Sequence, residues 1–470
     1  MKKTFEPTNA LILVALLTLI LTPRPIAGYL NLAQAEIHSN EHFTSLDVAR
    51  YYASAAERIP WRPDLYERTG FTFKNGDEYS MAEKFFRLAL QHHAISPDGW
   101  LAWGDAIYMQ GDVPGAIAIW IEALEQNKPD PFVHAYLARG HEEMGNYADA
   151  MQEWKVFLKV YPEYDWAHFR LGLLLAATTP EKALPELMQA AQLNPDLDPT
   201  VQRLRTALNT AFLSDDRAYQ FLVSGRSLGA LGEWDLAVEA FHNAIAVRLN
   251  YADAWAWLGE AEQQQGKNGN FEIEQALTLD PKSALIQGLY GMYLQRQGQP
   301  EQALAAFYKA AHLEPDDPGW QMALGSASEQ TGDLVAAYEY YFQAVEMAPA
   351  DASTWRALVA FSVTNNVDVE MTGLPAARKL VALAPNDWWS YDLAGQAEFM
   401  LEKYTAAESY LNKAVQMNPA QPAPNLHLGL VYLQTGDRGL AYSYLNLAKT
   451  LDPNGSYGKQ ADRLLEQFFP

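Results

Sequence analysis

The chain has 470 residues, of which 49% are hydrophobic and 19% charged, so it can bury a large core and is neither a fibrous nor a wholly disordered protein. It carries 57 acidic against 34 basic residues, for a net charge of -23, and shows no local cluster of Lys and Arg, which argues against nucleic acid as a partner. The absence of cysteine excludes disulfides, thiolate zinc sites, iron–sulfur clusters and a cysteine nucleophile.

The N-terminus resembles an export signal. Lys2 and Lys3 precede an apolar run from Ala10 to Leu21, which is short for a membrane-spanning helix of about 17 to 25 residues unless its flanks contribute. Cleavage after Ile26-Ala27-Gly28 or Ala33-Gln34-Ala35 is an open alternative, because the first motif is weak and the second lies far from the run. We expect a membrane anchor with the N-terminus in the cytoplasm and the C-terminus outside it, or else a secreted chain after signal cleavage.

A period close to 34 residues organises the rest of the chain. Within each period apolar residues recur at intervals of three and four, a glycine interrupts them, and a proline ends the second segment, which predicts a helix, a turn and a second helix. We find no run that alternates with the period of a strand. The closing prolines are Pro281, Pro315, Pro349, Pro385, Pro419 and Pro453.

This pattern resembles the tetratricopeptide repeat family, in which Trp, Leu-Gly, Tyr, Gly, Ala, Phe or Tyr, Ala and Pro hold set places in a 34-residue unit. The resemblance covers nearly the whole chain and implies an all-α, right-handed superhelical solenoid of about 12 helix-turn-helix units with a C-terminal capping helix. Three of the clear copies are Trp100, Gly104, Gly111, Ala116, Trp120 and Ala123; Tyr290, Gly291, Gly298, Ala303, Phe307, Ala310 and Pro315; and Leu324, Gly325, Gly332, Ala337, Tyr341, Ala344 and Pro349.

Departures from the repeat suggest how the chain is divided. One segment adds a helix outside the repeat and could separate two stacks; GKNGNFEIEQAL shortens a second helix and TNNVDVEMTGLPAAR lengthens a turn. At the end of the chain, Leu464, Leu465, Phe468 and Phe469 could cover the last unit. The predicted divisions are an N-terminal signal at 1–28, a first stack at 29–195, an extra helix and connector at 196–217, a second stack at 218–453 and a cap at 454–470.

Several short motifs that mark catalytic or metal sites in other proteins lack the structural surroundings that those sites need. Gly225-Arg226-Ser227-Leu228-Gly229 matches a nucleophile elbow but lies in a predicted helix, and His141-Glu142 begins a zinc motif whose second ligand position is a glycine. His92 and His93 are more typical of surface or packing positions. The paired tryptophans at 100/103, 255/257 and 388/389 suit core packing better than binding platforms. We therefore expect no catalytic residue, metal or cofactor.

The remaining functional surface is the concave groove that the resemblance implies, lined by the first helices of the repeats. Acidic and amide side chains dominate the candidate liners, with Lys74, Arg139 and Arg296 isolated among them, so we expect basic or polar extended segments rather than a C-terminal carboxylate to bind there. The candidate liners are Glu67, Phe71, Lys74, Asp105, Tyr108, Arg139, Glu142, Glu143, Glu260, Gln263, Met292, Gln295, Arg296, Ser326, Glu329, Gln396 and Phe399.

The sequence therefore predicts a non-enzymatic, membrane-anchored or secreted scaffold that binds peptide segments of envelope proteins outside the cytoplasm. Two alternatives stay open. Groove aromatics could instead bind a glycan or cell-wall polymer, which requires them to be exposed rather than buried. The chain could also be an accessory subunit of a surface enzyme.

Overall fold

A computed structural model describes residues 23–39, 45–126 and 130–469, and the described residues are helical with no β-strand. The contacts divide the chain into two compact units, Met1–Val247 and Arg248–Pro470, which we describe separately. The apolar run at 10–21 lies outside the described residues. The Ile26-Ala27-Gly28 and Ala33-Gln34-Ala35 motifs lie inside the first described helix.

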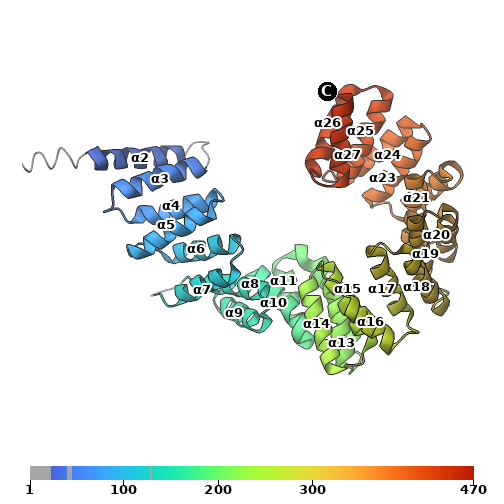
Figure 1. The fold of residues 1–470 in the computed structure, drawn as a ribbon, viewed down its shortest axis with the longest axis horizontal. Coiled ribbons are helices and arrows are strands. Elements are labelled where there is room, and N and C mark those ends of the chain that lie inside the picture. Colours follow the sequence, from blue (N-terminus) through green and yellow to red (C-terminus); the bar gives the residue numbers. More distant parts are fainter. Residues whose placement is uncertain (1–22, 40–44, 127–129, 470) are drawn as a thin grey trace, which may run out of the picture. The chain divides into compact units, whose positions relative to one another are not determined.

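Unit 1 is a stack of antiparallel helix pairs laid side by side in chain order (Figure 1). The pairs are α2/α3, α4/α5, α6/α7, α8/α9, α10/α11 and α13/α14, with α12 between the last two. The helices are α2 (Pro23–Ser39), α3 (Ser45–Arg58), α4 (Asp64–Asn75), α5 (Tyr79–Gln91), α6 (Pro97–Met109), α7 (Val113–Leu124), α8 (Val133–Glu143), α9 (Tyr147–Val160), α10 (Asp165–Thr178), α11 (Ala183–Leu193), α12 (Asp198–Ala211), α13 (Arg217–Gly229) and α14 (Trp234–Val247), with short 3-10 turns at Pro180–Lys182 and Pro195–Leu197.

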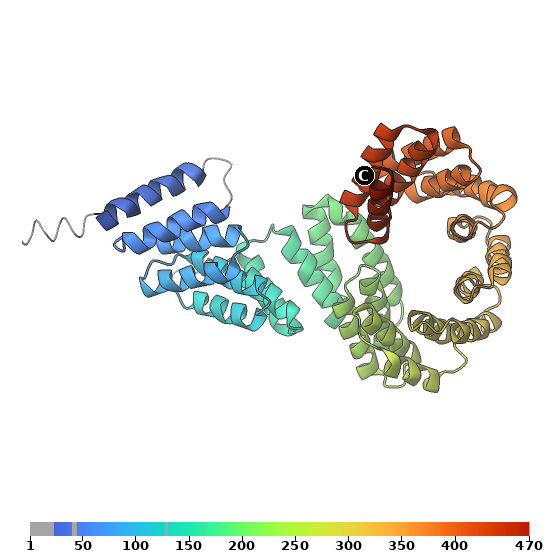
Figure 2. The same cartoon turned by 45° about the horizontal axis from the view of Figure 1, so that its top comes forward.

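Unit 2 continues the same pattern with six pairs and a final single helix; its consecutive pairs are stacked in chain order (Figure 2). The described residues thus hold twelve pairs, which confirms the all-α solenoid of about 12 units. The helices are α15 (Ala252–Gln264), α16 (Asn270–Leu279), α17 (Ala284–Arg296), α18 (Pro300–Leu313), α19 (Pro318–Thr331), α20 (Leu334–Met347), α21 (Ala352–Asn365), α22 (Leu374–Leu383), α23 (Trp388–Met400), α24 (Tyr404–Met417), α25 (Pro422–Thr435), α26 (Arg438–Leu451) and α27 (Ser456–Phe468), with a π-helical turn η3 (Val369–Gly373) before α22.

The repeated residues set the ends of the helices. Asp317 and Asp351 accept hydrogen bonds from the backbone N–H groups at the starts of α19 and α21, so a carboxylate caps these two first helices. Gly332 ends α19 with φ +82°, a left-handed conformation that a side chain would strain. One unit of sequence thus specifies where each helix starts and where the chain turns.

Close packing between the two helices of a pair explains the other repeated glycine. In α6, a Cβ added at Gly104 would lie 2.1 Å from Nε1 of Trp120, whose side chain is fully buried. The indole N–H donates to the Leu101 carbonyl at 3.3 Å, so this large side chain fills the pair without an unpaired polar group. Small residues such as Ala116, which is also fully buried, allow the neighbouring helices to approach.

The three segments that depart from the repeat in sequence also depart from it in structure. The extra helix is α12, and around it α10 packs against both α13 and α14. The contacts divide the chain between Val247 and Arg248, later than the connector expected at 196–217. The shortened helix is the 10-residue α16, and the lengthened turn contains η3, preceded by positive φ angles at Asn366 and Asp368.

The C-terminal helix α27 packs on α25 and α26. Leu465 is buried with Leu426 and Leu445, and Leu464 and Phe469 pack beside this cluster. Phe468 stays 38% exposed and is not part of this cluster, so it contributes less to the cap than the sequence predicts.

Candidate functional site

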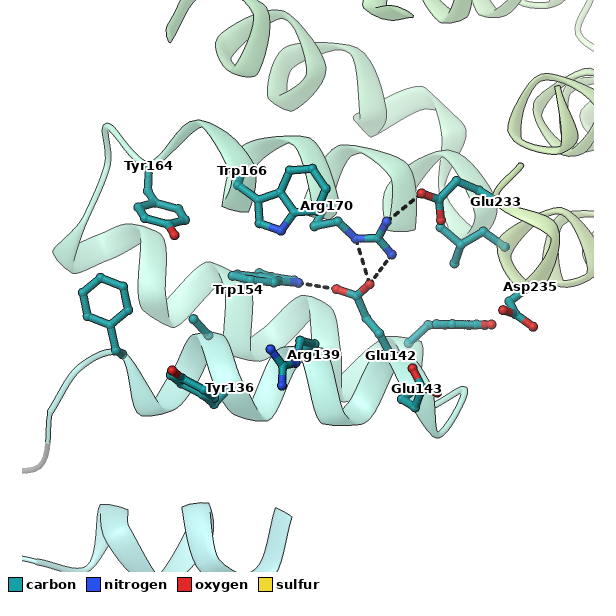
Figure 3. A pocket seen from close by; sticks show the side chains of 14 residues that line it. Tyr136, Arg139, Glu142, Glu143, Trp154, Tyr164, Trp166, Arg170, Glu233 and Asp235 are labelled. Atoms are coloured by element: carbon teal, nitrogen blue, oxygen red, sulfur yellow. Dashed lines mark hydrogen bonds and ion pairs between the residues drawn. The ribbon is translucent and has the colours of Figure 1, made fainter. Parts of the chain in front are cut away.

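A hollow in unit 1 has a volume of about 640 Å³ and lies between α8, α9, α10 and the start of α14 (Figure 3). Residues three or four apart on α8 and α10 point into it because they share one helix face. We call it the aromatic hollow. Its lining residues are Phe132, Ala135, Tyr136, Arg139, Glu142, Glu143, Tyr147, Trp154, Tyr164, Trp166, Arg170, Glu233, Asp235 and Leu236.

One end of the aromatic hollow is apolar. Phe132 and Tyr164 meet edge to face with ring centroids 6.0 Å apart, and Trp154 lies deeper, only 4% exposed. Trp166 and Tyr164 are 49% and 38% exposed at the rim. Large aromatic side chains that stay exposed beside a cavity provide contact area for a ligand at little cost in conformational entropy.

The other end holds an ion network around Arg170 of α10. Its guanidinium contacts Glu142 on α8, with Nε to Oε2 at 2.9 Å, and Glu233 before α14, with Nη1 to Oε1 at 2.8 Å. Trp154 Nε1 donates to the other Glu142 oxygen at 2.6 Å (Figure 3). Burial opposes the charge on Arg170, but the two carboxylates outweigh burial and raise its pKa above the usual value. Both oxygens of Glu142 are therefore engaged inside the protein.

Tyr147 lies beside this network. Burial raises the pKa of its phenol to about 12, and the carboxylates of Asp235, Glu239 and Glu142 add to the effect. The phenol stays protonated at neutral pH and can donate a hydrogen bond. Glu143, in contrast, is exposed and receives a long 3.4 Å contact from the Tyr108 hydroxyl, so its carboxylate is available to a ligand.

A second set of contacts joins the predicted residues of three successive repeats. Lys74 Nζ lies 2.7 Å from Asp105 Oδ2, and Arg139 Nη2 lies 3.0 Å from Asp105 Oδ1. The Arg139 guanidinium also sits 4.2 Å from the centre of the Tyr108 ring. Lys74 and Arg139 are therefore not isolated, because positions about one repeat apart lie side by side on neighbouring helices.

Unit 2 repeats this arrangement. The Glu260 side chain is 5% exposed and accepts hydrogen bonds from the two terminal guanidinium nitrogens of Arg296, at 2.8 and 2.6 Å, across 36 residues of sequence. Gln263 accepts from the same guanidinium at 2.9 Å, so Arg296 is not isolated either. Gln295 contacts Ser326 at 3.4 Å.

The remaining predicted liners have structural contacts of their own. Glu67 accepts from the Ser96 backbone N–H at 2.6 Å, and Glu329 accepts from Asn365 at 2.6 Å and from Tyr341 at 3.2 Å. Gln396 donates to Asp392 at 2.9 Å. Met292 is 40% exposed. Phe71 and Phe399 are half-buried against their own repeats, Phe71 beside a second hollow of about 390 Å³.

Sequence reasoning missed nine polar or aromatic residues of the aromatic hollow: Phe132 and Tyr136 at α8, and seven from other segments. The candidate liners were taken from the first helices of clear repeats. These seven residues come instead from the second helix α9, from a weak repeat and from the chain around the turn before α14. The nearness of Trp154 and Trp166 in a 13-residue stretch is the one signal that could have found them. The seven residues from other segments are Tyr147, Trp154, Tyr164, Trp166, Arg170, Glu233 and Asp235.

The motifs set aside earlier lie in ordinary helical surroundings. Ser227 is inside α13, and its hydroxyl donates to the Val223 carbonyl at 2.8 Å, so the strand-turn-helix of a nucleophile elbow is missing. The His92 ring stacks on Tyr66 at 4.8 Å. Trp100 and Trp103 are buried, whereas Trp389 is 43% exposed.

Across 23–39, 45–126 and 130–469, no three His, Asp or Glu side chains are grouped as metal ligands. In the same ranges no helix combines the length and the apolar character needed to cross a bilayer.

Comparisons with known proteins agree with this architecture. The tetratricopeptide repeat profile matches residues 222–284, 291–352 and 393–456, so the chain carries tetratricopeptide repeats. It is 24% identical over 254 residues to the BBSome complex member bbs-4 of Caenorhabditis elegans, and 24% identical over 262 residues to the BBSome complex member BBS4 of Bos taurus. These alignments cover 52% and 54% of this chain, and the chain spans about half the length of these curated relatives, 54% and 48%.

Solved structures with a similar course include the APC/C hetero-tetramer Cut9-Hcn1, at 16% identity and a TM-score of 0.47. That match covers 93% of this chain and 95% of the other. Yeast Tom70 is 14% identical with a TM-score of 0.43, and the match covers 95% of both chains. Tetratricopeptide repeats fit a role in protein–protein interaction.

Proposed function

We propose that this chain is a non-enzymatic scaffold that binds extended segments of other proteins, with the aromatic hollow as its main anchoring point. One observation carries the proposal: exposed Trp166 and Tyr164 stand beside an acidic, water-accessible cavity. Anchoring pockets of this kind, with an aromatic wall and a few polar groups, are typical of hot spots in protein interfaces.

The charge of the aromatic hollow favours a basic segment. Its lining has four carboxylates against two guanidinium groups. Arg170 is held by Glu142 and Glu233, and Arg139 contacts Asp105 and the Tyr108 ring, so both cations already have acidic partners within the protein. A Lys or Arg side chain could lie against the exposed ring of Trp166 as a cation on an aromatic face, and Glu143 supplies an exposed carboxylate elsewhere in the lining.

The placement outside the cytoplasm belongs to the same proposal. Lys2 and Lys3 before the apolar run, and a 25-residue stretch after Arg24 without Lys or Arg, support a chain whose N-terminus stays in and whose repeats face out. Segments of envelope proteins would then be the partners, either for an anchored chain or for one released by cleavage. An accessory role beside a surface enzyme is one form of this scaffold.

The experiment is photo-crosslinking in cells from inside the aromatic hollow. A crosslinking amino acid replaces Trp166, and a matched variant carries it at Tyr308 of α18, which is 50% exposed and far along the chain from the hollow. We expect adducts specific to Trp166 that map by mass spectrometry to extended, basic peptide segments. Equal adducts from both positions would refute the hollow as the anchoring point.

A charge variant sharpens this test. Glu143→Lys should remove the specific adducts, whereas Glu143→Gln should only weaken them, because Glu143 is the exposed carboxylate. Asp105 and Glu142 are unsuitable for charge reversal, since both are tied into ion pairs between repeats. Adducts that persist unchanged with Glu143→Lys would contradict the preference for basic segments.

A second candidate function is glycan binding. The exposure of Trp166 and Tyr164 meets its requirement that aromatics line a cavity. It predicts that Trp166 adducts carry polysaccharide instead of peptide and are insensitive to Glu143→Lys, so the same experiment separates the two functions.

A further inference from the structure

The first described helix, α2, is apolar on two opposite faces. Gly28, Leu32 and Ala35 are buried against the rest of the stack. Ile26, Leu30, Ala33 and Ile37 follow one another at intervals of four, three and four and form a stripe on the opposite side, which we call the outer stripe. Ile26, Leu30 and Ile37 are 60%, 62% and 50% exposed, so the outer stripe faces away from the protein.

An outward apolar face is unusual for a helix at the end of a solenoid, since terminal repeats normally present polar surfaces to water. The other end of the chain follows that rule, because α27 covers the last repeat and shows polar residues such as Lys459 and Glu466. The outer stripe therefore requires a specific occupant.

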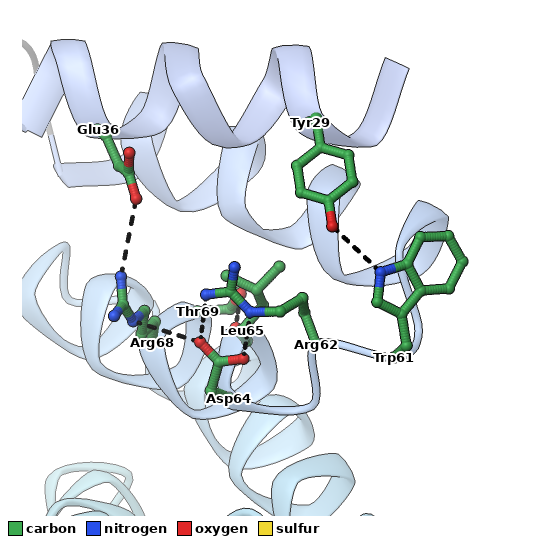
Figure 4. A network of polar contacts seen from close by, with 8 residues as sticks. All are labelled: Tyr29, Glu36, Trp61, Arg62, Asp64, Leu65, Arg68 and Thr69. Atoms are coloured by element: carbon green, nitrogen blue, oxygen red, sulfur yellow. Dashed lines mark hydrogen bonds and ion pairs between the residues drawn. The ribbon is translucent and has the colours of Figure 1, made fainter. Parts of the chain in front are cut away.

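Aromatic side chains with polar tips flank the outer stripe. Tyr29 of α2 is 48% exposed and Trp61, in the turn after α3, is 56% exposed; the Trp61 indole donates to the Tyr29 hydroxyl at 3.2 Å (Figure 4). Tyr and Trp collect at the level of lipid headgroups because they combine an apolar ring with a hydrogen-bonding tip.

The charged groups on the same side are already paired within the protein. Arg68 lies 3.9 Å from Glu36 of α2 and 3.8 Å from Asp64, and Arg62 makes two 2.9 Å hydrogen bonds to Asp64 (Figure 4). Acidic and basic groups thus balance beside the helix, and binding through the outer stripe would depend on apolar contact rather than on anionic lipid.

The sequence before α2 indicates the occupant. The apolar run Ala10–Leu21 ends two residues before α2 begins at Pro23, so a run placed in a membrane brings α2 to the membrane surface. We propose that α2 lies along a lipid bilayer with Ile26, Leu30 and Ile37 inserted and Tyr29 and Trp61 at headgroup level. This inference rests on the membrane placement proposed above, and it makes the first repeat a surface-binding element that orients the following repeats.

The absence of cysteine makes the test direct. Single Leu30→Cys and Ile37→Cys variants of the full chain are labelled with a nitroxide and reconstituted in phosphatidylcholine vesicles. We expect both labels to be more accessible to oxygen than to a water-soluble nickel chelate, at a depth of about 5 to 10 Å below the phosphates. Control labels at Gln34, on the polar flank of α2, and at Leu213, which is 89% exposed, should show the reverse order.

Other outcomes overturn the inference in distinct ways. Labels at Leu30 and Ile37 that stay water-accessible in vesicles exclude a lipid contact. Protection without vesicles that grows with protein concentration assigns the outer stripe to a second copy of the chain, and protection independent of concentration assigns it to another segment of the same chain.

A label at Leu13 separates this inference from the proposed anchoring. A lipid-exposed label at Leu13 with water-accessible labels at Leu30 and Ile37 leaves the anchor standing and removes the surface contact. The crosslinks from Trp166 are read independently of all these labels, so the scaffold function stands or fails on its own.

Discussion

Arg170→Met is the most informative single change, because it removes the cation that joins three segments of unit 1. The substitution leaves Glu142, whose side chain is 11% exposed, beside Trp154 without its counter-charge. Glu233, whose side chain is 29% exposed, also loses its partner but stays partly solvated. Breaking a buried pair by removing one partner costs about 3 to 5 kcal/mol, and the partial hydration of these carboxylates reduces the expected cost to about 2 to 3 kcal/mol.

Hydrogen exchange of the full chain measures the loss of stability helix by helix, which is needed because long repeat arrays need not unfold in a single step. The opening equilibrium of α8 and α10 should rise roughly 30- to 150-fold, while α21 to α26 should keep their protection. The matched control is Arg50→Met, whose pair with Asp47 is 3.7 Å long with side chains 68% and 47% exposed and is worth less than about 1 kcal/mol.

A second substitution decides whether the uncompensated charge is the cause. Glu142→Gln added to Arg170→Met removes that charge and keeps an acceptor for Trp154, so it should recover at least half of the lost protection. An Arg170→Met cost no larger than that of Arg50→Met, or no recovery in the double variant, would refute the reasoning.

Three further predictions concern other parts of the repeat architecture. Gly104→Ala should lower stability to urea several times more than Gly111→Ala, because the added Cβ would collide with Trp120. An added Cβ at Gly111, at φ +86°, meets open space and costs only about 1 kcal/mol of backbone strain. Equal losses of stability would contradict this account of the packing. The difference in ultraviolet titration between the native chain and Tyr147→Phe should isolate one phenol with a pKa near 12, raised by burial and its neighbouring carboxylates; its contribution to stability is complete below about pH 10 and is lost as pH rises toward 12, and Tyr147→Phe should remove that part of the pH dependence. Trp166→Ala should remove specific binding to the aromatic hollow with little change in urea midpoint, since the side chain is 49% exposed; a large loss of stability would show that it is a core residue.

The polar contacts between repeats explain why the groove is less acidic than its composition suggests. Asp105 pairs with Arg139 at a separation of 34 residues, and Glu260 pairs with Arg296 at 36. Residues at equivalent positions of adjacent repeats become neighbours in a solenoid, so opposite charges one period apart neutralise each other. Only acids without such a partner in the next repeat, such as Glu143, remain for a ligand.

The sequence by itself determined the helix pairs, their number and many of their ends, because those depend on local spacing: a proline soon after most second helices, a capping acid before several first helices such as Asp317 before α19, and a turn glycine such as Gly332. Departures from the same local spacing indicated α12, the short α16 and the lengthened turn at η3.

Only the tertiary structure decided which of these side chains meet. The 17 candidate liners came from one helical register, but the aromatic hollow also draws on Trp154 of a second helix and on Glu233, which contacts Arg170 across 63 residues of sequence. The outer stripe of α2 reads in sequence as ordinary repeat core, and only the packing of Leu32 and Ala35 on the opposite face shows that Leu30 and Ile37 point outward. Spacing along a helix says which residues share a face, whereas the contacts of that face depend on the packing of neighbouring helices.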